Sequence, residues 1–82
     1  MRLTAFTDYS LRVLIHLGVQ PEHRATISEV ADAFGISRNH LVKVVHFLSK
    51  EGLLANTRGR SGGMRLAVAP RQVNIAAVVR RT

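Results

Sequence analysis

The sequence of 82 residues contains no cysteine and no long apolar run. Without thiols, the chain cannot form a disulfide, use a thiol nucleophile, or hold zinc or an iron–sulfur cluster through its own thiolates. The sequence also predicts neither a membrane span nor a signal peptide, because no charged start leads into a cleavable apolar segment. We therefore expect a single cytoplasmic domain that does not span a membrane and is stabilised by packing.

Acidic residues are also scarce. The chain has 5 Asp+Glu against 12 Lys+Arg, which gives a formal net charge of +7 at pH 7. Such a surplus of positive charge favours a polyanionic partner, and on charge alone this is either a nucleic acid or an anionic membrane face. The hydrophobic content of 46% is enough for a thin core, which oligomerisation would supplement.

The first helical pattern covers about residues 4–17. Apolar residues recur there at helical spacing, and Phe6 and Tyr9 belong to the apolar stripe. Asp8 and Arg12 are four residues apart with the acid first, which is the favourable order for an ion pair on a helix surface. From the residues alone, such a pair explains Asp8.

Two further helices follow in close succession and form a predicted helix-turn-helix over about residues 28–51. Thr26 and Glu29 have the spacing of a capping box at the start of the second helix, and Gly35 ends that helix. Ser37 can cap the third helix after a turn of only a glycine and an isoleucine. The short turn predicts that the two helices meet at an angle.

The pattern then changes to short alternating segments. Residues 53–68 predict a two-stranded hairpin with a basic, glycine-rich turn, which would be the wing. Asn74 can cap a last helical pattern over residues 74–82, which is short and has no stop signal, so we expect the chain to belong to a longer protein. Residues 19–25 and 69–73 have the composition of loops. The predicted fold of residues 1–82 is mainly α with a small β-hairpin, a winged helix-turn-helix.

The third helix has a polar face opposite its apolar stripe. Arginine and lysine can bind guanine, asparagine can bind adenine, and a valine can contact a thymine methyl group, so this face suits the major groove of double-stranded DNA. The residues on it are Arg38, Asn39, Val42, Lys43 and His46.

Phosphate contacts are predicted at the helix starts and at the hairpin turn. The hydroxyl groups of Thr26, Ser28 and Ser37 lie beside free backbone N–H groups, which together bind phosphate oxygens. Arg58 and Arg60 flank a glycine in a narrow turn, and such a turn fits a minor groove.

Other readings of these residues remain open. A polar helix face is often only the solvated side of an amphipathic helix, and a basic winged helix can also bind RNA or an acidic protein. DNA is favoured because the turn spacing, the cationic face and a second basic element occur together. No residues pair a nucleophile with a base, and the histidines lack metal-ligand spacing, so we expect neither an enzyme nor a metal site built from this chain alone.

Four segments of the chain carry a resemblance to a known family. They are LTAFTDYSLRVLIHL, SEVADAFGISRNHLVKVV, RGRSGGMRLA and VNIAAVVRRT, and together they resemble the N-terminal part of the NsrR/IscR family of bacterial winged-helix iron–sulfur transcription regulators. The resemblance is strongest to the nitric-oxide-sensitive branch. It implies a transcriptional repressor of nitric-oxide stress genes that, when full length, is a homodimer on a palindromic operator. It places the recognition positions on Arg38, Asn39, His40 and Lys43, and the wing contact on Arg58-Gly59.

The resemblance also implies a [2Fe-2S] or [4Fe-4S] cluster in the full-length protein, which nitric oxide destroys. In the nitric-oxide-sensitive branch an aspartate, here Asp8, completes a cluster held by three cysteines of the partner subunit. These 82 residues alone hold no cluster, since they contain no cysteine. The alternative within the family is a regulator that responds to iron–sulfur or redox status.

Overall fold

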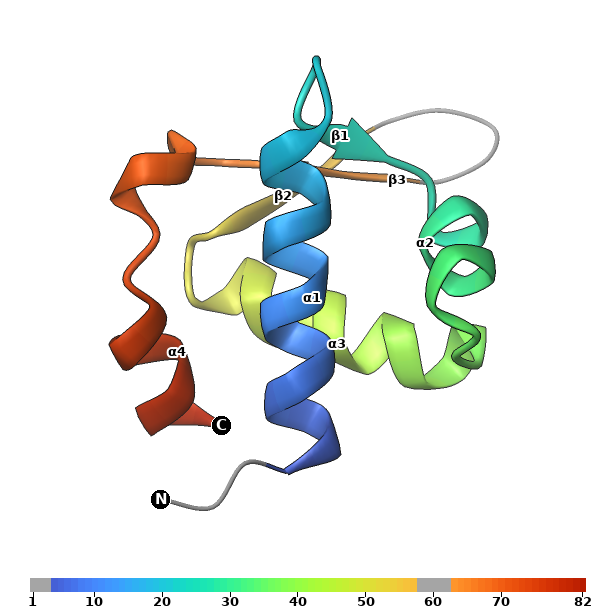
Figure 1. Ribbon diagram of the computed structural model, residues 1–82, viewed down its shortest axis with the longest axis horizontal. Helices are drawn as coiled ribbons and strands as arrows, with labels where there is room; N and C mark the ends of the chain where they lie inside the picture. Colours follow the sequence, from blue (N-terminus) through green and yellow to red (C-terminus); the bar gives the residue numbers. More distant parts are fainter. Residues whose placement is uncertain (1–3, 58–62) are drawn as a thin grey trace.

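The computed structural model describes residues 4–57 and 63–82. In Figure 1, the helix α1 (Ala5–Val19) stands between α2 (Ile27–Phe34) and α4 (Ile75–Arg81), and α3 (Arg38–Lys50) crosses it. A small sheet lies at one end of this arrangement. The remaining elements are β1 (Arg24–Ala25), β2 (Leu54–Thr57), β3 (Gly63–Leu66) and the 3-10 helix η1 (Pro70–Gln72).

The helices begin where their capping residues predict. The Thr26 hydroxyl oxygen accepts a hydrogen bond from the Glu29 backbone N–H at 3.0 Å, and the Glu29 carboxylate accepts one from the Thr26 N–H at 3.2 Å, so the capping box is confirmed. Ser37 accepts from the His40 N–H at 3.1 Å, and Asn74 caps α4 in the same way. Each cap satisfies a backbone donor that the helix itself leaves unpaired.

The turn between α2 and α3 depends on Gly35. This residue is in the left-handed conformation with φ 66°, which costs a side-chain-bearing residue free energy. The following Ile36 N–H bonds back to the Ala31 carbonyl at 3.1 Å. The chain therefore leaves α2 abruptly and enters α3 at the angle of a helix-turn-helix.

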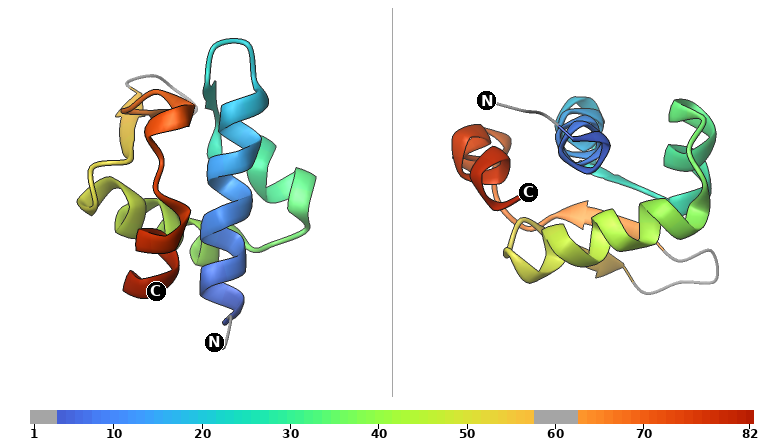
Figure 2. Two further views of the ribbon diagram at one scale, coloured as in Figure 1. Left: turned by 60° about the vertical axis from the view of Figure 1, so that its left-hand side comes forward. Right: turned by 90° about the horizontal axis from the view of Figure 1, so that it is seen from below.

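The core forms where α1 packs on α3 and on the sheet. Seen from below in Figure 2, α3 runs beneath α1, with α2 and α4 on opposite sides of α1. Phe6 on α1 meets Phe47 on α3 edge-on, with ring centroids 5.3 Å apart. The largest fully buried apolar side chains of this core are Leu17, Leu41, Leu48, Met64, Val13, Val30 and Val44.

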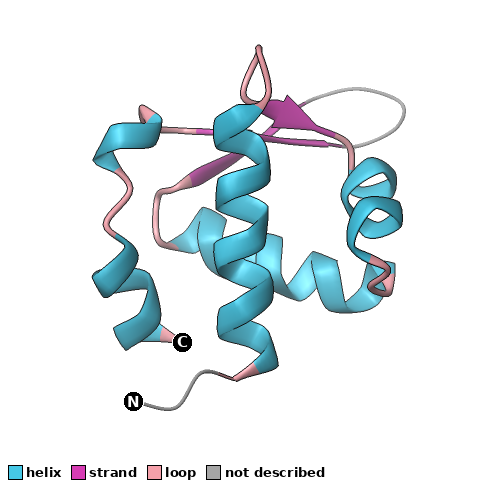
Figure 3. Ribbon diagram, in the orientation of Figure 1, coloured by secondary structure: helices cyan, strands magenta, loops and turns pink. Residues whose placement is uncertain are grey.

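The sheet differs from the prediction, because it has three strands where the sequence predicted a two-stranded hairpin. The order is β1-β3-β2, all antiparallel, so β3 is central (Figure 3). The additional strand β1 lies in the segment that was predicted to be a loop, and its Ala25 pairs with Met64. Because β1 is two residues long, it has no alternation that the sequence could display. A second correction concerns residues 69–73, which contain η1.

Helix α4 closes the open side of α1. Val78 is its buried residue, and Arg81 forms a 2.9 Å ion pair with Glu51 at the end of α3. The Thr82 hydroxyl is hydrogen-bonded to that of Thr7 on α1. These contacts tie the last residues of the chain to both α1 and α3.

Candidate nucleic-acid interface

The outer face of α3 carries the side chains that the sequence placed there. Leu41, Val44, Val45 and Leu48 are buried on the inner side. The outer side is exposed at every predicted position, namely Arg38, Asn39, Val42, Lys43 and His46. These side chains are therefore accessible to a partner on the side of α3 that faces away from the core.

Arg38 is positioned by the neighbouring helix. Its Nη2 donates a hydrogen bond to the Ser28 hydroxyl oxygen in the first turn of α2. A guanidinium has five N–H donors, so this bond leaves others for a partner. Ser28 therefore holds the Arg38 side chain across the turn, which is a role that sequence spacing did not show.

The hydroxyl groups of Thr26 and Ser37 can each accept one hydrogen bond and donate another. Each oxygen accepts a backbone N–H at its own helix start, as described above, while the hydroxyl hydrogen is not used by that bond. Both residues lie at the amino-terminal ends of helices, where the helix dipole favours an anion. Thr26 at the start of α2 and Ser37 at the start of α3 therefore each keep a hydroxyl donor for a further acceptor.

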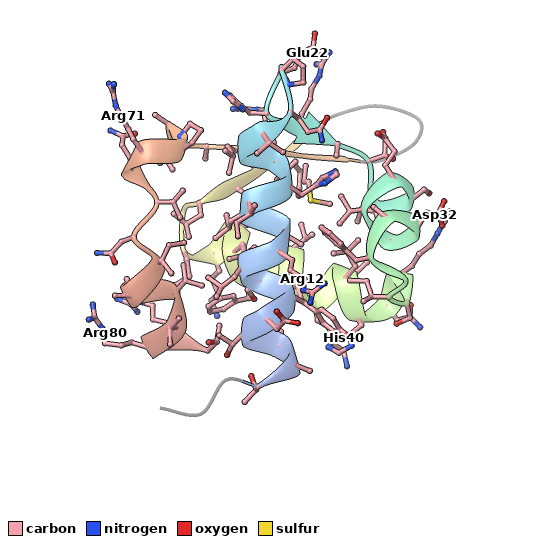
Figure 4. The ribbon with its side chains drawn as sticks, in the orientation of Figure 1. Arg12, Glu22, Asp32, His40, Arg71 and Arg80 are labelled. Atoms are coloured by element: carbon pink, nitrogen blue, oxygen red, sulfur yellow. The ribbon has the colours of Figure 1, made fainter. Side chains whose placement is uncertain are left out.

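The structure does not bring His40 onto the exposed face. Its ring is half-buried and meets Tyr9 of α1 edge-on, with centroids 4.9 Å apart. The geometric reason is that two residues advance about 200° around a helix, so His40 lies on the opposite side from Arg38. Figure 4 shows His40 at the start of α3, below Arg12 in this view.

Of the predicted wing, the structure describes the strands β2 and β3. Arg58, Gly59 and Arg60 lie outside the described residues. On β3, Arg65 is exposed and pairs in register with Ala55 of β2.

A groove of about 390 Å³ lies between α2, α3 and the strands of the wing. Sequence reasoning missed this groove and two of its polar residues, Ser49 and Asn56, because only tertiary packing brings α3 beside β2. Ser49 has a buried hydroxyl oxygen without a hydrogen-bond partner in the described structure. The groove is lined by Ile27, Val42, Val45, His46, Ser49, Asn56 and Gly63.

Ion pairs among the described residues do not neutralise the positive charges on the outer face of α3. Within residues 4–57 and 63–82, no carboxylate lies within ion-pair distance of Arg38 or Lys43. Arg71 and Arg80, labelled in Figure 4, extend from η1 and α4 on the other side of α1 from α2. The pairs that the described residues do form are Arg12–Asp8, Arg24–Glu22 and Arg81–Glu51.

Asp8 lies in the first turn of α1 with a side chain that is 49% exposed. Its Oδ1 accepts a hydrogen bond from Arg12 Nε at 3.1 Å, so the predicted ion pair on the helix surface is confirmed. Among the described residues, no three His, Cys, Asp or Glu side chains gather to hold a metal ion. The described residues therefore do not form an iron–sulfur site on their own. In the same part of the chain, no helix is both long enough and apolar enough to cross a bilayer.

Comparison with known proteins gives matches over nearly the whole chain. Residues 3–82 match the Rrf2 family, described as iron-dependent transcriptional regulators. An HTH-type transcriptional regulator NsrR of Shouchella clausii is 51% identical over 83 residues, which cover 100% of this chain and 56% of that protein. A second NsrR, from Halalkalibacterium halodurans, is 49% identical and is covered to 57%. The chain thus spans a little over half the length of these relatives, which are transcriptional regulators and not enzymes.

A solved structure supports the fold independently. The global cysteine regulator CymR of B. subtilis superposes with a TM-score of 0.87 over 98% of this chain and 63% of that chain, at 23% sequence identity. At this identity the likeness shows the fold and nothing more. The winged helix-turn-helix predicted from the sequence is confirmed.

Proposed function

The chain belongs to the Rrf2 family of transcriptional regulators, and from this premise we propose that it is the sequence-specific DNA-binding domain of a repressor. The domain covers residues 1–82, with the helix-turn-helix at about 28–51, the wing at about 53–68 and the start of a further helix at 74–82. The observation that carries the proposal is the exposed cationic face of α3. Its Arg38 and Lys43 have no carboxylate partner among the described residues, and a groove separates the face from the wing.

In the proposed complex, α3 enters the major groove of double-stranded DNA. Arg38 and Asn39 read the edges of guanine and adenine, and Lys43 binds guanine or phosphate. Thr26, Ser28 and Ser37 donate to phosphates, which fixes the register of α3 on the duplex.

The other two elements of the proposed interface act beside α3. Arg58, Gly59 and Arg60 of the wing enter the minor groove. His40 takes part through its position, because its ring is packed on Tyr9 and holds the first turn of α3 against α1.

We place the domain in a cytoplasmic homodimer that binds a palindromic operator when full length. Support for self-association comes from large apolar side chains that are exposed on α1 and α4, away from the α3 face. Ile15 is 60% exposed and Ile75 is 46% exposed, and both line the same small cavity. A twofold dimer would present two α3 helices to successive major grooves.

We further propose that the full-length protein is nitric-oxide-responsive through an iron–sulfur cluster, as its resemblance to NsrR regulators implies. Asp8 is the ligand that this chain would contribute, since its half-exposed carboxylate has only the Arg12 side chain as an ion-pair partner among residues 4–57 and 63–82. The thiolate ligands belong to sequence outside these 82 residues, because the chain contains no cysteine. A regulator of the same family that responds to iron–sulfur or redox status is the second candidate.

The test of DNA binding compares two duplexes. Fluorescence anisotropy is measured with an operator selected from a pool of random duplexes and with its scrambled version, across a series of salt concentrations. We expect tighter binding to the selected duplex at every salt concentration. Equal affinity for both duplexes throughout would refute sequence-specific binding and would favour a protein-interaction or RNA-binding module. Salt dependence alone does not separate these cases, because a basic face gives it with any acidic partner.

The sensing proposal has its own test in the full-length protein. The operator complex is exposed separately to a nitric oxide donor and to an iron chelator. Release by nitric oxide at intact iron supply supports the nitric-oxide-responsive repressor. Release only on chelation or oxidation favours the iron–sulfur or redox-status regulator.

A further inference from the structure

Val42 is the one apolar residue among the five predicted to form the outer face of α3. Its side chain is 50% exposed, although exposure of an apolar side chain to water costs free energy. Arg38 is four residues before it and His46 four residues after it, so the three side chains follow one line along the helix. An apolar contact point therefore lies between two polar ones on the surface proposed to face DNA.

The surroundings of Val42 do not form a larger apolar patch. The other large hydrophobic side chains that are exposed among the described residues are Ile15, Val19 and Ile75, on α1 and α4. Val42 instead borders the groove between α3 and the wing, whose rim carries the polar side chains of His46 and Asn56. A single apolar side chain among polar groups is too small a surface to dock a protein partner.

A methyl group is the ligand that this arrangement fits. In the major groove the C5-methyl of thymine is the apolar feature of the base edges, and hydrogen-bonding side chains cannot recognise it. Arg38 and His46 on either side of Val42 can bond the neighbouring bases or phosphates, which would bring Val42 close to a base edge. Ile27 and Val45 line the same groove, but Ile27 is partly buried and Val45 is buried, so Val42 is the exposed apolar side chain there.

We propose that Val42 is a specificity-determining residue that recognises the methyl group of a thymine in each half-site. This inference rests on the proposed function, since it requires α3 to lie in a major groove. It deepens that proposal by predicting a thymine at a fixed position of the operator, next to the bases that Arg38 and Asn39 read.

The experiment removes the methyl group from the DNA and the side chain from the protein. An operator is selected with the wild-type chain from random duplexes, and each thymine is then replaced singly by deoxyuridine, which differs only in lacking the methyl group. Anisotropy titrations are made with the wild type, Val42→Ala and Val42→Thr. Val19→Ala is the matched control, because Val19 is also an exposed helical valine, 74% accessible and on α1.

Burial of one methyl group predicts that deoxyuridine at the contacted position weakens wild-type binding by about fourfold. Val42→Ala should bind the two duplexes about equally at that position, while Val19→Ala keeps the wild-type ratio. Alanine favours a helix more than valine, so a loss of affinity in Val42→Ala with an unchanged circular dichroism spectrum is not a folding defect. Val42→Thr keeps the shape of the side chain, exchanges one methyl for a hydroxyl, and should give an intermediate ratio.

Two results overturn the inference in distinguishable ways. If the wild type prefers its selected duplex to a scrambled one but no thymine responds to deoxyuridine, or if Val42→Ala keeps the response, the role of Val42 is refuted while the proposed function stands. If the wild type shows no preference between duplexes, the proposed function itself fails, and the inference fails with it.

Discussion

Ser37 allows the capping of α3 and its contact with DNA to be separated by two substitutions at one position. Its hydroxyl oxygen accepts the His40 N–H at 3.1 Å, and its hydroxyl hydrogen is proposed to bind a phosphate. Ser37→Ala removes both interactions. Ser37→Asp keeps a capping oxygen but presents a negative charge to the same phosphate.

The expected stabilities follow from the cap. Loss of a serine cap costs about 1 kcal/mol, against a total unfolding free energy of about 4–12 kcal/mol for a domain of this length. For Ser37→Ala this corresponds to a decrease in Tm of about 4–8 °C. Aspartate caps as well as serine and adds a favourable interaction with the helix dipole, so Ser37→Asp should be at least as stable as the wild type.

The expected affinities follow a different order. Ser37→Ala loses a hydrogen bond to a charged group and should bind the operator about tenfold more weakly. Ser37→Asp should bind about fivefold more weakly again, because two negative charges about 4 Å apart near a surface repel each other by at least 1 kcal/mol. The variant with the better cap is therefore expected to be the worse DNA binder.

Thermal unfolding followed by circular dichroism measures the stabilities of these variants. Fluorescence anisotropy with the selected operator measures their affinities. Asn74→Asp is the matched control, since Asn74 caps α4 in the same way at a helix that packs on α1. It should leave operator affinity within about twofold of the wild type, because a distant surface charge is screened by salt. Wild-type affinity in Ser37→Asp would refute the phosphate contact, and an unchanged Tm in Ser37→Ala would refute the energetic weight given to the cap.

Four further predictions concern base readout, the wing and two glycines. Asn39→Ala should relax base preference at one operator position by about 1–3 kcal/mol, and an unchanged preference in a repeated selection would move the readout elsewhere. Arg58→Ala and Arg60→Ala should each weaken binding to all duplexes and reduce the slope of log K against log salt by roughly one unit, whereas an unchanged slope contradicts a phosphate contact. Gly35→Ala should destabilise the fold by about 1 kcal/mol because φ is 66° there, with no atom within 4 Å to add a clash. Gly18 lies in the helical α1, and a Cβ added there would be 3.8 Å from the Pro70 Cβ, so Gly18→Ala should instead stabilise the fold by about 0.5 kcal/mol in urea unfolding.

The features that the sequence predicts best are those determined locally. Caps such as Thr26 and Ser37 need only a side chain and the backbone three residues on, so their spacing was sufficient. The exposed face of α3 was predicted for the same reason, because half a helical turn separates it from the buried stripe. The strand β1 exists only through its pairing with β3, and a two-residue segment carries no signal of a distant partner.

Helix α1 shows where periodicity falls short. The apolar stripe placed Phe6 and Tyr9 with the core, and both pack against it while half-buried, but the stripe did not show that Thr7 and Ser10 are buried as well. The Ser10 hydroxyl donates to the Phe6 carbonyl at 2.8 Å, so a small polar residue is satisfied within its own helix. Because α1 is surrounded by α2, α3, α4 and the sheet, its buried surface is wider than the stripe that a hydrophobic pattern reveals.

The packing of α1 also brings the turn that carries Asp8 into contact with α3, the helix proposed to read DNA. Tyr9, the next residue after Asp8, meets His40 at 4.9 Å, and Phe6 meets Phe47 at 5.3 Å, so the first turns of α1 contact α3 near both of its ends. His16 meets Phe34 at 5.4 Å and connects α1 to α2. Close-packed aromatic contacts transmit a displacement rather than absorb it. We therefore expect a shift in the first turn of α1 to be passed to α3 through these contacts.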